Sequence, residues 1–260
     1  MLVVESTAGR CHRRHTSADA DLRSAPQLSL TGPVAESTRA IEFCRGPSRR
    51  ALLEELLSLR SSFVSTVGWF APGHYDRDEY DEHVETIHVA VRDRATRAIV
   101  AAMRLTPVTA AQHSLSWSMF NALDVQTPAP TPLDTMWDAT RLVCQVDGGF
   151  TEQAIVESFT VLYGFGIGLT ATSQEGNTRW VFTATKSMTR HLRRLGIHHD
   201  VVHSARISVT DADDSYFCVA NPHAIRHAIM HSPLTPAFTR HYFSAGLALA
   251  ERELRESVYP

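Results

Sequence analysis

The spacing of apolar residues divides the chain into strand-like and helix-like segments. Apolar residues recur at helical spacing across residues 49–62 and residues 151–171. A third helix ends at Gly196, a residue typical of helix C-termini, and two more follow Pro222 and Pro236. Alternating or β-branched runs predict strands at residues 86–93, 98–107, from 137, 178–185, 201–209 and 215–220. This order predicts an α/β or α+β sheet with helices on both faces.

The first 40 residues differ from the rest of the chain. They are rich in Ser, Thr, Arg and Ala and show little periodicity, so we predict a disordered extension over residues 1–40 and a single domain over residues 41–260. Arg10, Arg13 and Arg14 precede no apolar segment, which excludes a signal peptide. No apolar run approaches the roughly 20 residues of a membrane helix, and we therefore expect a cytoplasmic protein.

Composition adds little to this picture and excludes some functions. Apolar residues make up 43% of the 260 positions, enough for a sizeable core, and a net charge of -3 gives no drive toward nucleic acid. The four cysteines are far apart and contain no C-x-x-C pair, which predicts reduced thiols. Among the 14 histidines there is no H-E-x-x-H motif, so we expect no metal site.

Three polar islands carry the candidate chemistry: Asp78-Glu-Tyr-Asp81, Arg104-Leu105 and Trp137-Asp-Ala-Thr-Arg141. In a regular strand, Asp138 and Arg141 would point to opposite faces, because side chains alternate. Only a bulge would bring both to one site. From these residues alone, a surface aspartate beside an ion-paired arginine is an equally good interpretation.

The order of the islands resembles the signature of LuxI-type acyl-homoserine-lactone synthases, and the resemblance covers roughly residues 50–220. The family pattern begins with an arginine and two aromatic residues on a first helix, matched here by Arg60, Phe63 and Trp69. Arg60 precedes Phe63 by three residues where the family has four, so that Leu59 stands at the aligned position. The segment 183–196 resembles the family's strand ending in Thr followed by a basic helix.

This resemblance implies a GNAT-like three-layer α-β-α sandwich whose mixed sheet splays open into a V-shaped cleft. It also implies an acyltransferase of quorum-sensing signal synthesis. The enzyme joins an acyl thioester to the amine of S-adenosylmethionine, closes the lactone and releases methylthioadenosine. S-adenosylmethionine is then a cosubstrate, and no other cofactor is expected. Nucleic acid and membrane insertion are not expected among its partners.

Site residues follow from the same resemblance. Asp138 stands where the family has a glutamate that takes the amine proton, and its shorter side chain favours transfer through water. Arg104 and Arg141 suit either the methionine carboxylate or ion pairs with the aspartates, and the sequence does not separate these roles. The full set implied for S-adenosylmethionine is Arg60, Phe63, Trp69, Asp78, Asp81, Arg104, Phe120 and Arg141.

The donor side has two sets of candidates. Trp137, Thr140, Phe182 and Thr185 are implied as the wall of an acyl-chain pocket. A basic helix with Lys186, Arg190, Arg193 and Arg194 is implied as a dock for acidic acyl carrier protein, although coenzyme A is an equally open donor.

Two other enzyme or binding functions remain open: a GNAT-type N-acyl amino acid synthase and a relative that binds acyl carriers without turnover. A further motif, the Gly-x-Gly-x-Gly run at 164–168, resembles a phosphate-binding turn. It follows a helical pattern and lacks a lysine, so we expect it to let a helix pack closely or end.

Overall fold

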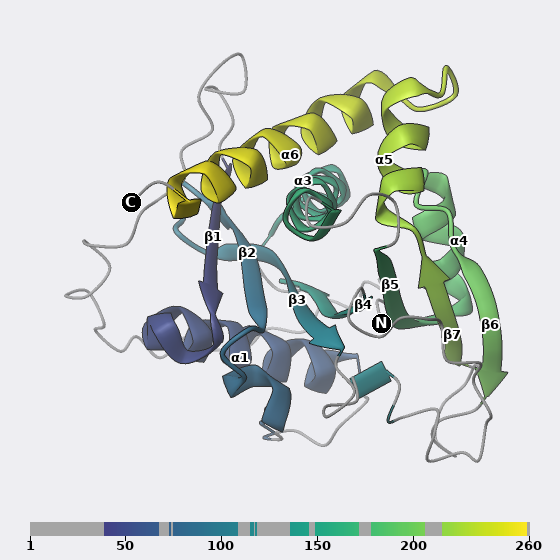
Figure 1. Ribbon diagram of the computed structural model, residues 1–260. Coiled ribbons are helices and arrows are strands. Elements are labelled where there is room, and N and C mark those ends of the chain that lie inside the picture. The colour runs from purple at the N-terminus through teal and green to yellow at the C-terminus, as the bar shows by residue number, and fades with distance from the viewer. Residues whose placement is uncertain are drawn as a thin grey trace.

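The computed structural model describes residues 39–67, 73, 75–108, 115–116, 118, 136–145, 149–171, 178–205 and 215–258. A seven-stranded sheet runs through this part of the chain in the order β1-β2-β3-β4-β5-β7-β6 (Figure 1). The strands are β1 (Arg39–Arg45), β2 (Ile87–Asp93), β3 (Ile99–Val108), β4 (Met136–Cys144), β5 (Arg179–Thr185), β6 (Asp200–Ala205) and β7 (Ser215–Ala220). The pattern of alternating apolar residues predicted all of these strands except β1.

Helices cover both faces of this sheet. One face of β1–β3 carries α1, and α3 crosses the opposite face with α6 packed along it, while α4 and α5 lie beside β5 and β7 (Figure 1). The helices are α1 (Arg50–Thr66), α3 (Glu152–Ala171), α4 (Lys186–Arg194), α5 (Pro222–His231) and α6 (Ala237–Val258), with short 3₁₀ helices η1 (Gly46–Arg49) and η2 (Glu79–Glu82). The predicted three-layer α-β-α architecture is confirmed.

The sheet changes direction and separates between β4 and β5. The strands β1 to β4 pair antiparallel, whereas β4 and β5 are parallel neighbours joined through α3. Their pairing extends only from Met136 opposite Arg179 to Asp138 opposite Val181, although both strands continue beyond it. The mixed, splayed sheet expected from the resemblance is therefore present, and Asp138 stands at the point where the two strands part.

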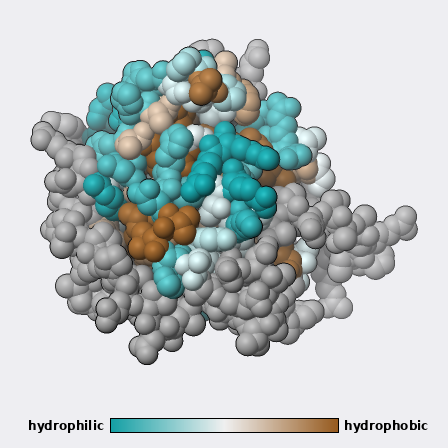
Figure 2. Space-filling view, turned by 90° about the vertical axis from the view of Figure 1, so that its right-hand side faces the viewer, coloured by the Kyte–Doolittle hydropathy of each residue, from teal (hydrophilic) through white to brown (hydrophobic). Residues whose placement is uncertain are grey.

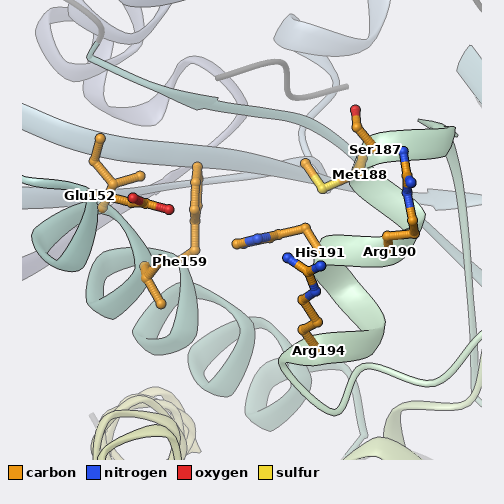
Figure 3. A pocket seen from close by; sticks show the side chains of 9 residues that line it. Glu152, Phe159, Ser187, Met188, Arg190, His191 and Arg194 are labelled. Atoms are coloured by element: carbon orange, nitrogen blue, oxygen red, sulfur yellow. The ribbon is translucent and has the colours of Figure 1, made fainter. Parts of the chain in front are cut away.

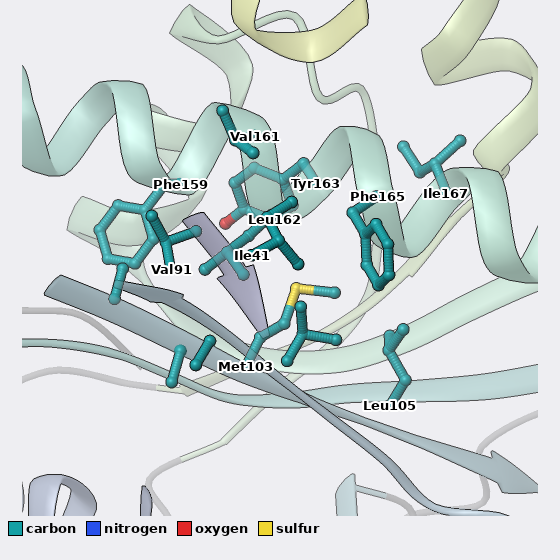
Figure 4. Close-up of a cluster of buried hydrophobic side chains, with 14 of the residues drawn as sticks. Ile41, Val91, Met103, Leu105, Phe159, Val161, Leu162, Tyr163, Phe165 and Ile167 are labelled. Atoms are coloured by element: carbon teal, nitrogen blue, oxygen red, sulfur yellow. The ribbon is translucent and has the colours of Figure 1, made fainter. Parts of the chain in front are cut away.

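The core lies between α3 and strands β1 to β3 (Figure 4). Phe159, Leu162 and Phe165 of α3 are almost fully buried against Val91 and Met103 of the sheet. By length and composition α3 could cross a membrane, but 83% of its most apolar window is buried inside the protein. The expectation that no apolar run reaches this length was wrong, because a core helix enclosed by sheet and helix is as apolar as a membrane span.

The N-terminal boundary also needs a correction. Arg39 and Ala40 are buried in β1, and Arg39 forms an ion pair with Asp93 of β2. The predicted extension, residues 1–40, therefore wrongly included the first two residues of the sheet. Residues 1–38 lie outside the described part of the chain.

Three cysteines, Cys44, Cys144 and Cys218, are buried free thiols, as expected, and burial raises their pKa. Cys11 lies outside the described residues.

Close packing of α3 on α6 depends on glycine. A Cβ atom on Gly164 would lie 2.2 Å from the carbonyl oxygen of Phe243, and one on Gly246 would lie 2.2 Å from that of Val161. Such distances are far inside van der Waals contact with rigid backbone. The interpretation of the Gly-x-Gly-x-Gly run as a helix-packing motif is confirmed.

Replacing Gly164 with Ala should therefore destabilise the fold. The helix-propensity gain of about 1 kcal/mol is opposed by a backbone clash, and overpacking costs about 1–3 kcal/mol or more. We expect a net loss of about 1–2 kcal/mol in urea unfolding, whereas Gln153→Ala on the exposed first turn of α3 should change stability by less than about 0.5 kcal/mol. A Gly164→Ala protein as stable as wild type would contradict the close approach of the two helices.

Candidate functional site

The acidic island folds into a short helix that turns its carboxylates inward. The Asp78 side chain accepts a hydrogen bond from the backbone N–H of Tyr80 at 3.0 Å, and Asp81 accepts one from the N–H of Asp78 at 2.9 Å. This reciprocal capping starts η2 and fixes both side chains. Asp81 has no exposed surface. The island is thus not the solvated acidic loop that its composition alone suggests.

Three arginines from separate elements converge on these carboxylates. Arg60 of α1 and Arg104 of β3 donate to the same Asp81 oxygen, at 2.5 and 2.7 Å. Arg60 also bonds Asp76 at 3.1 Å, and Arg104 bonds Asp78 at 2.5 Å. We call the following six residues the Asp–Arg network: Arg60, Asp76, Asp78, Asp81, Arg104 and Arg141.

Arg141 reaches the network through a β-bulge. Between the pairs Ala102–Val143 and Arg104–Thr140, one β3 residue stands opposite two residues of β4. Arg141 occupies the left-handed region with φ 54°, which is unusual for a residue other than glycine. Its guanidinium donates to Asp78 at 2.9 Å and pairs with Asp76 at 3.0 Å. The bulge that the sequence required is confirmed.

The network is deeply buried at one end and opens at the other. The side chains of Asp81, Arg104 and Arg60 are 0%, 1% and 3% exposed, whereas those of Asp78 and Arg141 are 18% and 21% exposed. Three arginines balance three aspartates, so the formal charges cancel. Among the described residues, Nη2 of Arg60, Nη2 of Arg104 and Nε of Arg141 are buried without a hydrogen-bond acceptor. The network therefore retains donor capacity for an added anionic group.

Electrostatic coupling keeps the buried carboxyl group of Asp81 ionised. Burial by itself raises the pKa of Asp81, but the guanidinium groups of Arg104 and Arg60 outweigh it and hold that pKa below its usual range. Below the network, Nε2 of His88 lies 3.0 Å from the carbonyl oxygen of Asp81. Burial is the main cause that lowers the pKa of His88 to about 4, so its neutral ring donates this bond.

The candidate base Asp138 is held by a residue that the sequence did not single out. Asp138 is fully buried on β4, two residues before Thr140, and Thr140 accepts a hydrogen bond from Arg104 at 3.4 Å. The backbone N–H of Ser116 donates to Oδ2 of Asp138 at 3.0 Å, and its hydroxyl donates to Oδ1 at 2.7 Å. No motif marks Ser116, whereas Asp76 could have been found from the repeated Asp-x-Asp at 76–78.

Positions of the other predicted ligands vary. Arg60 reaches the network despite its shifted spacing, because its buried side chain lies on the side of α1 that faces Asp81. Phe63 is buried in the hydrophobic core and lines a cavity of about 290 Å³ between α1 and the ends of β3 and β4. Trp69 and Phe120 lie outside the described residues.

A cleft opens where α3 and α4 begin, beyond the diverging ends of β4 and β5 (Figure 3). We call it the α3–α4 cleft; its volume is about 270 Å³. Apolar Phe159 and Met188 form its inner part, and Arg190, His191 and Arg194 approach it from α4 (Figure 3). Its lining comprises Glu152, Ile155, Val156, Phe159, Ser187, Met188, Arg190, His191 and Arg194.

The basic residues predicted on α4 are all exposed: Lys186, Arg190, Arg193 and Arg194. Arg190 and Arg194 line the α3–α4 cleft, so basic charge surrounds an opening with an apolar interior. Figure 2 views the side of the molecule that carries α4 and β6, where hydrophilic side chains gather. Lys186 is the only lysine in the chain.

The predicted acyl-chain wall is placed as follows. Trp137 is half-buried and packs against the hydrophobic core. The rings of Phe182, which is buried, and His199 are arranged edge to face, with their centroids 5.6 Å apart. Thr185 caps α4 by accepting from the N–H of Met188, and Thr140 bonds Arg104. Among the described residues, no group of three or more His, Cys, Asp or Glu side chains is arranged to hold a metal ion.

No family model matches the sequence, and no curated protein matches it. Solved structures do match the fold. TofI, in a ternary complex with an inhibitor and MTA, is 20% identical with a TM-score of 0.55, over 80% of this chain and 98% of that chain. The CoA-dependent acyl-homoserine lactone synthase MesI is 18% identical with a TM-score of 0.54, over 78% and 95%. The CoA-dependent synthase BjaI, solved with MTA, is 15% identical with a TM-score of 0.56, over 83% and 99%. The chain thus has the fold of acyl-homoserine-lactone synthases.

Buried His88 predicts a pH dependence of stability. The folded protein keeps His88 neutral down to about pH 4, whereas the unfolded chain protonates it below about pH 6.5. The unfolded state therefore binds more protons in this window, and His88 makes stability fall as pH decreases from 6.5 toward 4, by up to about 1.4 kcal/mol per unit. Urea unfolding of His88→Gln, which keeps an N–H donor, should show a shallower slope than wild type. Equal slopes in His88→Gln and wild type would refute the assignment.

Proposed function

We propose that this protein is a cytoplasmic acyltransferase that makes N-acyl-homoserine lactone from S-adenosylmethionine and an acyl thioester. One observation carries the proposal. The motif residues Arg60, Asp78, Asp81, Arg104 and Arg141 come from four separate segments and meet in one network. These residues lie far apart in the sequence, and the fold brings their charged groups into direct contact.

The network suits S-adenosylmethionine at its open end. Arg141, the arginine at that end, has an unpaired Nε that would receive the methionine carboxylate, and Asp78, the most exposed carboxylate, would face the amine or sulfonium. Of the two arginines whose role was left open, Arg141 then serves as ion pair and ligand contact, and Arg104 serves as an ion pair. BjaI has been solved with SAM and isopentyl-CoA, and TofI with MTA, which supports the same cosubstrate here.

The reaction needs little from the protein besides position and one proton transfer. Asp138, at the parting of β4 and β5, removes a proton from the S-adenosylmethionine amine, which attacks the thioester carbonyl. The amide forms and the donor thiol leaves. The methionine carboxylate then displaces the sulfonium at its γ-carbon, which closes the lactone and releases methylthioadenosine.

The acyl donor would enter through the α3–α4 cleft. Its basic rim, Arg190 and Arg194, suits the phosphate of a phosphopantetheine arm and the acidic surface of a carrier protein. The apolar inner part, formed by Phe159 and Met188, suits the acyl chain. Trp137 and Phe182 remain the proposed apolar wall, since the hydroxyls of Thr140 and Thr185 are engaged in hydrogen bonds.

Mass spectrometry of reaction products tests this function. The wild-type protein, given S-adenosylmethionine and a panel of acyl-coenzyme A and acyl-carrier-protein thioesters, should release acyl-homoserine lactone and methylthioadenosine in equal amounts. Asp138→Asn should lower kcat by about 10²–10⁴-fold, while calorimetry shows unchanged S-adenosylmethionine binding. N-acyl amino acids formed from free amino acids instead would favour the amino acid synthase, and no product from any donor would favour a binding protein.

Charge reversal on α4 tests the donor dock. Arg190→Glu with Arg194→Glu should raise the KM for an acyl carrier protein by about tenfold or more and leave that for S-adenosylmethionine unchanged. The effect should shrink toward about 0.5 M salt, where the Debye length is only about 4 Å. Arg252→Glu with Arg255→Glu on α6 provides the same charge change far from the cleft. A similar loss in both double variants would remove the docking role.

The single lysine permits an independent test of the same surface. A carbodiimide joins carboxylates to nearby amines, and once the amines of the carrier protein are blocked by acetylation, Lys186 is the only lysine side chain that can react. We expect a one-to-one cross-linked product that Lys186→Arg abolishes. Cross-linking that persists in Lys186→Arg would locate the carrier protein elsewhere.

A further inference from the structure

Ser116 makes two hydrogen bonds to the candidate base, Asp138. Both of its donors reach Asp138: the hydroxyl meets Oδ1 at 2.7 Å and the backbone N–H meets Oδ2 at 3.0 Å. Both residues have no exposed surface. A hydroxyl that only fills space would not need this alignment, and 2.7 Å is the usual length of a well-formed O–H···O bond.

This geometry matters because Asp138 has a short side chain fixed to a strand. A serine hydroxyl has one proton and two lone pairs, so after donating to Asp138 its oxygen can still accept a proton. The hydroxyl oxygen therefore extends the basic end of Asp138 by one hydrogen bond. An approaching amine could transfer its proton to the Ser116 oxygen instead of reaching the carboxylate itself.

We propose that Ser116 is a proton relay between the substrate amine and Asp138. This inference rests on the proposed synthase function and adds a catalytic residue to it. As the amine nitrogen attacks the thioester carbon, its N–H proton moves to Oγ of Ser116, and the Oγ–H proton moves to Oδ1 of Asp138. The serine ends unchanged, the carboxylate becomes protonated, and the departing thiolate can later recover that proton.

A purely orienting role for Ser116 makes a different prediction when the carboxylate is lengthened. Glutamate at position 138 is longer by one methylene, about 1.5 Å, and can reach the amine directly. In a relay, this longer acid makes the hydroxyl dispensable. If Ser116 only orients the carboxylate, the double variant has a longer side chain at position 138 and still lacks the Ser116 hydrogen bond. Its kcat should then not exceed that of Ser116→Ala.

The experiment compares kcat and KM for Ser116→Ala, Asp138→Glu and the double variant, with the acyl thioester that wild type uses best. We expect Ser116→Ala to lower kcat by about 10²-fold with the KM for S-adenosylmethionine within about twofold. Asp138→Glu in the Ser116→Ala background should then raise kcat at least tenfold above Ser116→Ala alone. Ser116→Thr, which keeps a hydroxyl, should stay within about threefold of wild type.

Controls separate this inference from other failures. Ser118→Ala removes a hydroxyl of the same segment, one that lies 3.3 Å from the Tyr80 hydroxyl, and should lower kcat less than threefold. A Ser116→Ala protein within threefold of wild type, or a double variant no faster than Ser116→Ala, overturns the relay. If Ser116→Ala does not fold, an inactive Ser116→Thr overturns it. A wild type without turnover contradicts the proposed function itself, and the relay with it.

Discussion

The site depends on one carboxylate that water does not reach, that of Asp81. Two guanidinium groups, from Arg60 and Arg104, share one of its oxygens, and its other oxygen accepts a backbone N–H. Moving such charges out of water is costly, and the cost is offset only when each charge is paired with good geometry. Loss of one partner would leave the others buried and uncompensated. The Asp–Arg network therefore fixes α1, η2 and β3 relative to one another as strictly as the apolar core does.

The residues of this network have two roles: some hold elements of the fold together, and others can contact a ligand. The buried end around Asp81 holds the elements together, whereas the partly exposed end, Asp78 and Arg141, is where a ligand can arrive. Arg141 reaches that end from a left-handed backbone conformation that costs about 1–2 kcal/mol in a residue other than glycine. Its two carboxylate contacts offset this strain. The bulge that carries Arg141 follows Thr140, which accepts a hydrogen bond from Arg104, and Asp138 lies two residues earlier on the same strand.

Much of this arrangement could be predicted from the sequence, because it follows from local patterns. Alternation located β2 to β7, and the odd spacing of Asp138 and Arg141 required the bulge. Properties that depend on distant contacts could not be predicted. The first strand, Arg39–Arg45, was missed because it follows a polar, aperiodic stretch, and its place in the sheet is set by pairing with the distant strand β2. Ser116 carries no motif at all. Whether Arg104 pairs with an aspartate or with a ligand depends on its three-dimensional distance to Asp78 and Asp81, which the sequence does not give.

Calorimetric titration with S-adenosylmethionine tests the central claim, that the open end of the Asp–Arg network is the cosubstrate site. Wild type should bind, and Arg141→Gln should weaken binding by about tenfold or more, because Arg141 lies at the partly exposed end. Methionine alone, which lacks the sulfonium, should bind more weakly than S-adenosylmethionine. Absence of binding to wild type, or equal affinity in Arg141→Gln, would contradict the account.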